Sequence, residues 1–104
     1  MELGANDEVV LIAEAVALPG KRDELRRAFD ELIPKTLAEP GVSAFVLHED
    51  RDQAGHFMLY ERYLDFDAVE KHFASDHFAA ISDALAALAI DGKPTLTYYS
   101  EVGD

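Results

Sequence analysis

The sequence contains neither cysteine nor tryptophan. Without cysteine, disulfide bonds and thiolate metal ligands are excluded, so we expect a fold stabilised by packing and helped by oligomerisation. No stretch approaches the roughly 18 apolar residues that a membrane-spanning helix requires. Residues 1–8 have no basic start and no apolar run, so we expect no signal peptide and a cytoplasmic location.

Positive charge is also scarce, with 9 Lys and Arg against 21 Asp and Glu and a formal net charge of −12. This balance argues against binding to nucleic acids and to anionic membranes, because both require a basic protein surface. The chain also lacks a glycine-rich phosphate loop, the dinucleotide motif G-x-G-x-x-G and the nucleophile motif G-x-S-x-G. We therefore expect no nucleotide cofactor and no serine nucleophile.

What the chain does have is enough apolar sequence for one core. Its 104 residues, 49% of them hydrophobic, correspond to a single domain. We expect a flexible leader over residues 1–8 and one α+β domain over residues 9–104.

The apolar pattern predicts strands and helices in the order βαββαβ. Runs or alternations of apolar residues predict strands over residues 9–18, 42–50, 56–63 and 95–102. Helical spacing predicts helices over residues 21–39, from residue 66, and again after Asp76. We expect Pro34 to kink or break the first helix and Asp65 to cap the second. The order is typical of the ferredoxin-like fold, an antiparallel sheet with helices on one face.

The first strand is apolar on both of its faces, apart from Glu14. A strand with one exposed face would alternate between apolar and polar residues, and the ferredoxin-like plan leaves the second face of the sheet uncovered. We therefore expect a homodimer in which two sheets pack face to face.

A histidine and a glutamate are the main candidates for a reaction site. His72 falls on the inner side of the second helix, and Glu61 shares one face of the third strand with apolar side chains. A neutral imidazole in an apolar pocket can accept a proton from a phenol or an enol. Each residue also has a structural alternative. His72 could lie at the edge of the core and bond to a backbone carbonyl. Glu61 could form an ion pair with Arg62, with Lys71 or with a residue across a dimer interface.

The other histidines are weaker candidates. His77 follows His72 by five residues, which does not suit one helical face, so we expect it to cap or join two helices. His48 and His56 fall beside the predicted hairpin turn and are expected to be exposed. No known ligand spacing supports a metal site among these residues, and we predict none.

Several short motifs follow one another along the chain. They are Pro19-Gly20-Lys21, Glu39-Pro40-Gly41, the pattern Phe57-x-Leu59-x-Glu61-x-aromatic, and Ala68-Val69-Glu70-Lys71-His72 followed by Ser75-x-His77-Phe78. In this order and spacing they resemble the antibiotic biosynthesis monooxygenase family over residues 9–102. The resemblance implies a small dimeric α+β barrel.

Members of that family perform different reactions, so the resemblance implies a set of activities. These are cofactor-independent oxygenation of quinols and polyketide phenols, oxidative haem breakdown, and isomerisation of small phosphorylated sugars. For the haem-degrading members, the resemblance implies a site made of Asn, Trp and His. This chain has no Trp and no Asn in its first strand, so we expect no haem degradation. Where many relatives have tryptophan two residues after the strand glutamate, this chain has Tyr63, and the quinol monooxygenase branch fits better.

We therefore predict a cofactor-independent monooxygenase that oxidises a quinol or a phenolic, polyketide-like small molecule with O2. The predicted catalytic residues are His72 and Glu61. The predicted substrate-binding residues are Tyr63, Phe45, Phe57, Phe73 and His77, although such aromatic residues can also form the core or a dimer interface. Two alternatives remain: a non-catalytic dimer that binds a small molecule, and an isomerase or lyase acting on a small metabolite.

Overall fold

The computed structural model describes residues 7–103, so most of the predicted flexible leader lies outside the described residues. The carboxylate of Glu8, the last residue of that segment, accepts a hydrogen bond of 2.9 Å from the Arg62 guanidinium. The chain is therefore anchored one residue before its first strand.

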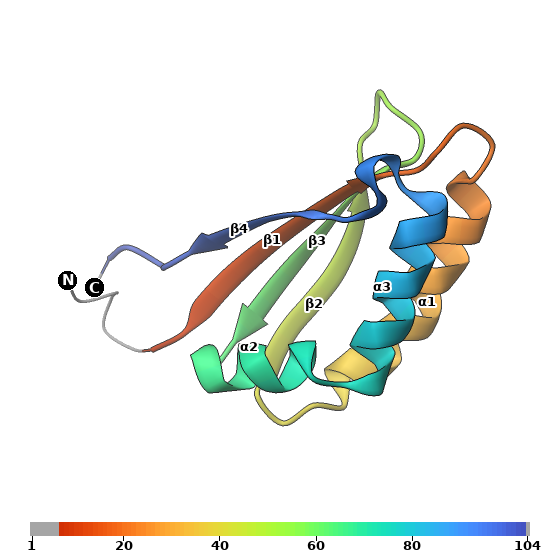
Figure 1. Ribbon diagram of the computed structural model, residues 1–104. Helices are drawn as coiled ribbons and strands as arrows, with labels where there is room; N and C mark the ends of the chain where they lie inside the picture. Colours follow the sequence, from red (N-terminus) through yellow and green to blue (C-terminus); the bar gives the residue numbers. More distant parts are fainter. Residues whose placement is uncertain (1–6, 104) are drawn as a thin grey trace.

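Within these residues the chain forms one antiparallel sheet with the strand order β2-β3-β1-β4. The strands are β1 (Val9–Val16), β2 (Val42–Glu49), β3 (His56–Tyr63) and β4 (Thr95–Tyr99). The helices are α1 (Arg22–Leu37), α2 (Phe66–Phe73), α3 (Asp76–Leu88) and the short 3-10 helix η1 (Ile90–Gly92). Helices α1 and α3 lie side by side against one face of the sheet (Figure 1). The predicted ferredoxin-like α+β fold is confirmed.

Element ends differ from the predictions by a few residues. Strand β1 stops two residues early and β4 three residues early. Pro34, expected to kink or break α1, does not break it, because the helix continues through it to Leu37. Pro34 is exposed, so water can satisfy the carbonyl that loses its helical donor. None of the described helices is long and apolar enough to cross a membrane.

Strand β3 shows why the sheet has one covered face. Its residues alternate strictly between buried and half-buried, and the buried set faces the helices. From α1 and α3, apolar side chains at helical spacing pack onto that set. This core includes Leu25, Phe29, Leu32, Ile81 and Leu85 against Ala15, Phe45, Phe57 and Leu59. A second, smaller cluster packs under α2 and consists of Val9, Leu11, Tyr63, Ala68 and Val69.

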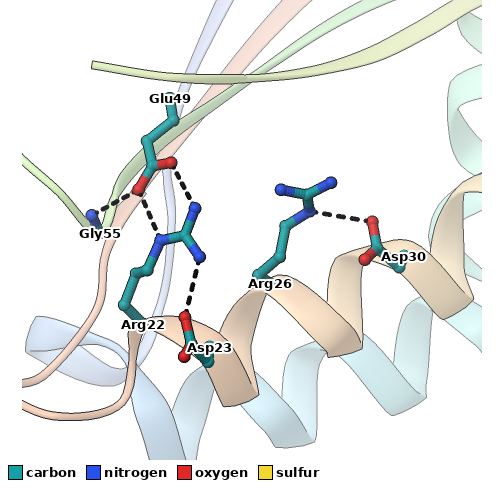
Figure 2. A network of polar contacts seen from close by, with 6 residues as sticks. All are labelled: Arg22, Asp23, Arg26, Asp30, Glu49 and Gly55. Atoms are coloured by element: carbon teal, nitrogen blue, oxygen red, sulfur yellow. Dashed lines mark hydrogen bonds and ion pairs between the residues drawn. The ribbon is translucent and has the colours of Figure 1, made fainter. Parts of the chain in front are cut away.

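An ion-pair network joins the start of α1 to the β2–β3 hairpin (Figure 2). Arg22 donates two hydrogen bonds to the Glu49 carboxylate, at 2.9 and 2.6 Å, and the backbone N–H of Gly55 donates a third at 2.8 Å. The guanidinium of Arg22 and the Gly55 N–H together lower the pKa of Glu49 to about 2. The network holds the hairpin against the helix at the end of the sheet away from α2 (Figure 1).

Strand β4 and the outer face of the sheet have little cover. Every residue of β4 is exposed, because this edge strand lies away from α1 and α3 (Figure 1). Val46 on β2 and Tyr99 on β4 each expose about half of their surface, at 48% and 53%. The sheet therefore keeps an uncovered apolar surface, as the pattern of the first strand predicts.

Candidate active site

An apolar cavity lies between the sheet and the helices. Its wall comes from all four strands on the sheet side and from all three α-helices on the other. The cavity measures about 30 Å³, and on this measure one water molecule needs roughly 10–15 Å³. Three residues of its lining carry ionisable side chains: Glu61, His72 and Glu14, and the Glu14 carboxylate lies on the outer face of the sheet beside His56. Pro94 and the partly exposed Leu96 line it near β4.

His72 is placed in the cavity wall by helix α2. The helix begins where predicted, because the Asp65 side chain accepts a hydrogen bond of 2.9 Å from the Ala68 N–H and so caps it. From this start, His72 falls on the inner face and is 2% exposed. Its ring centroid lies 5.6 Å from that of Phe45 and 5.4 Å from that of Phe78. The imidazole is therefore surrounded by aromatic rings and shielded from water.

Glu39 is the residue that the sequence analysis missed. It follows α1, in the turn Glu39-Pro40-Gly41. In the sequence, this tripeptide indicated only where the first helix ends. In the structure its Oε2 lies 2.8 Å from Nδ1 of His72 and 2.7 Å from Nε2 of His77. One carboxylate oxygen thus accepts a hydrogen bond from each of two histidines.

This hydrogen bond determines the tautomer of His72. A carboxylate oxygen can only accept, so Nδ1 of His72 carries the proton and Nε2 keeps its lone pair. The observed partner is this carboxylate and not the backbone carbonyl that was considered as an alternative. Burial lowers the pKa of His72 below its ordinary value of 6.5, against the opposing effect of Glu39. At neutral pH the ring is therefore neutral, and its Nε2 keeps a lone pair that can accept a proton.

His77 lies next to His72, with ring centroids 5.8 Å apart, and bonds to the same oxygen of Glu39. The helix break at Ser75 separates the two histidines, because Ser75 caps α3 by accepting a hydrogen bond of 3.2 Å from the Phe78 N–H. The prediction that His77 sits where two helices join therefore agrees with the structure. Its side chain lines an outer groove with Glu39 and is absent from the lining of the cavity.

Glu61 lies in the cavity wall and is 3% exposed. Its Oε1 accepts a hydrogen bond of 2.5 Å from the Tyr63 hydroxyl, two residues along the same face of β3. Burial raises the pKa of Glu61 to about 7, while the Tyr63 hydroxyl acts in the opposite direction. The same burial, together with the Glu61 charge, raises the pKa of Tyr63.

The ion pairs considered for Glu61 within the chain are not formed. Arg62 points to the other face of the sheet and pairs with Glu8 and Glu101. Lys71 pairs with Asp67 one turn earlier on α2. Because successive residues of a strand face opposite sides, Arg62 could not reach the side of the sheet that holds Glu61.

The predicted substrate-binding residues divide into two groups. Phe45, Phe57 and Phe73 line the cavity together with His72 and Glu61. Tyr63 is completely buried behind Glu61 and is not part of the lining, so it reaches the cavity only through its hydrogen bond. Of the two exposed histidines expected near the hairpin, His48 is exposed, whereas His56 is half-buried and lies 3.2 Å from Glu14.

Gly41 allows the turn that carries Glu39 to approach α2. A Cβ atom at Gly41 would lie 2.4 Å from the Cβ of Ala68 on that helix. We expect Gly41→Ala to lower the free energy of unfolding by about 1–3 kcal/mol, because backbone has to move to relieve the overlap. Chemical denaturation measures this change.

The matched control for Gly41→Ala is a double variant that also carries Ala68→Gly. Removing the opposing methyl should make the two substitutions strongly non-additive, although glycine inside α2 itself costs about 1 kcal/mol. Additive losses would show that the close approach of the turn to α2 does not limit stability.

The fold and the site together define a class: small ferredoxin-like α+β proteins with an apolar cavity and one buried, carboxylate-oriented histidine. Within this class, the chain belongs to the antibiotic biosynthesis monooxygenase family, whose sequence model matches residues 8–84. The family that the sequence motifs resemble is thereby confirmed.

Individual relatives are similar to this chain over most of its length. "Putative monooxygenase Rv0793" of Mycobacterium tuberculosis is 36% identical over 70 residues, which cover 67% of this chain and 68% of the relative. Its solved structure superposes with a TM-score of 0.86 at 28% identity, covering 93% of this chain and 97% of that one. PA3566 of Pseudomonas aeruginosa has a TM-score of 0.87 at 26% identity, covering 99% of this chain and 100% of that one.

A more distant structure shares the fold. SnoaB of Streptomyces nogalater, described as a cofactor-independent oxygenase, has a TM-score of 0.81 at 20% identity and covers 94% of this chain and 96% of its own. At this identity the likeness concerns the fold alone.

Proposed function

We propose that this protein is a cofactor-independent monooxygenase that oxidises a quinol or phenolic small molecule with O2. The observation that carries the proposal is the neutral imidazole of His72, which lines an apolar cavity and is held through Nδ1 by Glu39. Membership of the family and the description of Rv0793 support a monooxygenase. SnoaB provides an example of cofactor-independent oxygenation on the same fold.

In the proposed reaction, Nε2 of His72 takes the proton of a substrate hydroxyl and becomes an imidazolium. Glu39 stabilises this cation through the Nδ1–H hydrogen bond. The electron-rich phenolate gives one electron to O2, and the two radicals combine to form a carbon–oxygen bond. Loss of water from the resulting peroxide leaves a new carbonyl or hydroxyl oxygen on the ring.

The reaction balances without an external reductant. One quinol and one O2 yield one hydroxyquinone and one water, so the organic molecule gains one oxygen atom and loses two hydrogen atoms. The substrate supplies all four electrons that reduce O2, and His72 returns its proton to the departing oxygen. In this proposal Glu61, which accepts a hydrogen bond from Tyr63, holds a substrate oxygen at the cavity wall. The protein contributes positioning, a base and exclusion of water.

A substrate ring requires more room than the cavity has. About 30 Å³ suffices for O2 or one or two water molecules. The side chains near β4 are the least tightly packed part of the lining, since Leu96 is 39% exposed. We therefore propose that the substrate enters on this side and displaces them, while Phe45, Phe57 and Phe73 contact its ring faces.

The test is oxygen uptake by the purified protein with a panel of reduced quinols and polyphenols, under isotopically labelled O2 and with mass spectrometry of the product. We expect at least one compound to be consumed with one labelled oxygen gained per molecule. Heat-unfolded protein controls for autoxidation. Tight binding of flat aromatics without uptake would instead support the non-catalytic binding dimer.

The isomerase or lyase alternative receives less support from the site. Phosphorylated metabolites are held by basic side chains or by backbone N–H groups at helix N-termini. Among the described residues, no Lys or Arg lines the cavity. The ionisable groups that face it are the buried carboxyl of Glu61 and the neutral imidazole of His72, which favour a neutral aromatic substrate.

The homodimer remains a prediction that the uncovered outer face supports. Val46 and Tyr99 expose apolar surface on that face. A second copy packed there would bury it, and contact across the exposed β4 would bring further side chains towards the open side of the cavity. Light scattering should give a mass of twice 11.5 kDa, whereas a monomer in dilute solution would exclude this assembly.

A further inference from the structure

Three potential metal ligands converge at one point beside the cavity. They are Oε2 of Glu39, Nδ1 of His72 and Nε2 of His77, and all three atoms lie within 4.8 Å of one another. We propose that they form a binding site for a divalent transition-metal ion of the Zn²⁺ class. The binding itself is independent of the proposed oxygenase activity.

Each ligand comes from a different structural element. Glu39 lies in the turn after α1, His72 in the last turn of α2, and His77 in the first turn of α3. The Ser75 hydroxyl helps to hold the two helices, since it donates a hydrogen bond of 2.6 Å to the His72 carbonyl and accepts one from the Phe78 N–H. Histidines five residues apart therefore reach one point despite a spacing that a single helix does not allow.

The donor set and its geometry suit such an ion. Two imidazoles and one carboxylate are a common protein ligand set for Zn²⁺ and Fe²⁺. With metal–ligand bonds of about 2.0–2.1 Å, neighbouring ligands lie about 2.9 Å apart in an octahedral site and about 3.3 Å apart in a tetrahedral one. The present separations from the Glu39 oxygen are 2.8 and 2.7 Å. Small rotations of the side chains would therefore open the site, and the metal would replace the two ring N–H hydrogen bonds.

An ion can reach this point from outside. Glu39 and His77 line a surface groove of about 420 Å³, and their side chains are 16% and 18% exposed. Asp65 and Asp67 line the same groove, and its one lysine, Lys71, is 3.1 Å from Asp67. The acidic chain attracts cations, and water in the groove can complete the coordination.

Metal binding also has a consequence for the base, and this step rests on the proposed function. A neutral imidazole that binds a metal through Nδ1 carries its proton on Nε2. Nε2 would then be a hydrogen-bond donor and could not accept a substrate proton. We therefore expect a bound Zn²⁺ to inhibit oxygen uptake.

The direct test is calorimetric titration of metal-free protein with Zn²⁺, which needs no oxygenase substrate. We expect one ion per chain with a micromolar or tighter Kd, and a weakening of about 10–100-fold or more in His77→Ala and in Glu39→Gln. Co²⁺ in place of Zn²⁺ should give visible d–d absorption that is lost in the same variants. Thermal melting of each variant without metal verifies that it is folded.

His56 provides the matched control, because it forms a rival surface cluster with Glu14 and Asp50, at 3.2 and 3.6 Å. His56→Ala should leave the Kd for Zn²⁺ unchanged. The proposal is overturned if the folded protein shows no saturable binding, or if binding survives His77→Ala and is lost in His56→Ala. The titration contains no oxygenase substrate. The measured Zn²⁺ binding therefore remains valid even if the oxygen-uptake assay shows no activity.

Discussion

Alanine in place of His72 is expected to lower the rate of oxygen uptake with a responsive quinol by about 10²–10⁴-fold, the usual contribution of a general base. His72 is the only histidine in the lining described for the cavity, and Glu39 holds its ring with Nε2 unprotonated. Without it, the imidazole nitrogen proposed to take the substrate proton is gone, and the Glu61 carboxyl in the same wall is hydrogen-bonded to the Tyr63 hydroxyl. An oxygen electrode measures the loss directly.

The pKa of His72 also predicts how the rate of oxygen uptake depends on pH in the acidic range. Burial lowers the pKa of His72 below 6.5, so the ring is neutral and basic at neutral pH. The rate should fall as the pH drops through this lowered pKa, because the imidazolium cannot accept a proton. Glu61 also faces the cavity with a pKa of about 7, so the profile should be compared with that of Glu61→Gln to separate the two groups.

Two further variants make the His72 experiment decisive. His72→Asn keeps an amide near the position of Nδ1, where it can still bond to Glu39, but it removes Nε2, the nitrogen proposed to take the substrate proton. It should be as inactive as His72→Ala while retaining more stability. His48→Ala changes an exposed histidine and should leave the rate unaltered. A folded His72→Asn protein with the wild-type rate would show that His72 is not the base.

Glutamine in place of Glu61 is expected to stabilise the protein at alkaline pH by about 3 kcal/mol and to have little effect near pH 5. Glu61 has a pKa of about 7 in the folded protein against 4.5 as its ordinary value. The difference of about 2.5 pH units corresponds to about 3 kcal/mol at 1.36 kcal/mol per unit. Glutamine resembles the protonated carboxyl and cannot ionise.

The sign follows from proton uptake. Between pH 4.5 and 7 the folded protein binds more protons at Glu61 than the unfolded chain does, so stability falls as the pH rises through this range. The wild type should therefore lose stability from pH 4.5 to above pH 7, and Glu61→Gln should lack this part of the loss. Urea denaturation of both proteins at pH 5 and pH 9 measures the difference.

Glu31 on the outer side of α1 is the matched control for Glu61. It is exposed, so Glu31→Gln should change stability by less than about 0.5 kcal/mol at either pH. If Glu61→Gln were equally neutral at pH 9, the carboxylate would have to be solvated or paired, for example across a dimer interface. That result would contradict the buried, uncharged environment described here.

Much of the site followed from local sequence patterns. The Asp65 cap and the apolar positions after it place His72 on the inner face of α2, and the alternation of β3 places Glu61 on the covered face. Both inferences concern neighbours along the chain, whose relative positions depend on helix or strand period. The ion pair considered between Glu61 and Arg62 is not formed, because adjacent strand residues face opposite sides of the sheet and Arg62 pairs with Glu8.

The sequence by itself determined the order of the elements, their inward faces and the buried histidine, because each depends on residues a few positions apart. Only the tertiary structure decided what His72 contacts. Glu39 is 33 residues away from it, and the contact arises where the turn after α1 approaches α2 across Gly41. Such long-range proximity depends on how the helices pack on the sheet, and no spacing along the chain reveals it. The tautomer of His72 and the convergence with His77 both follow from that packing.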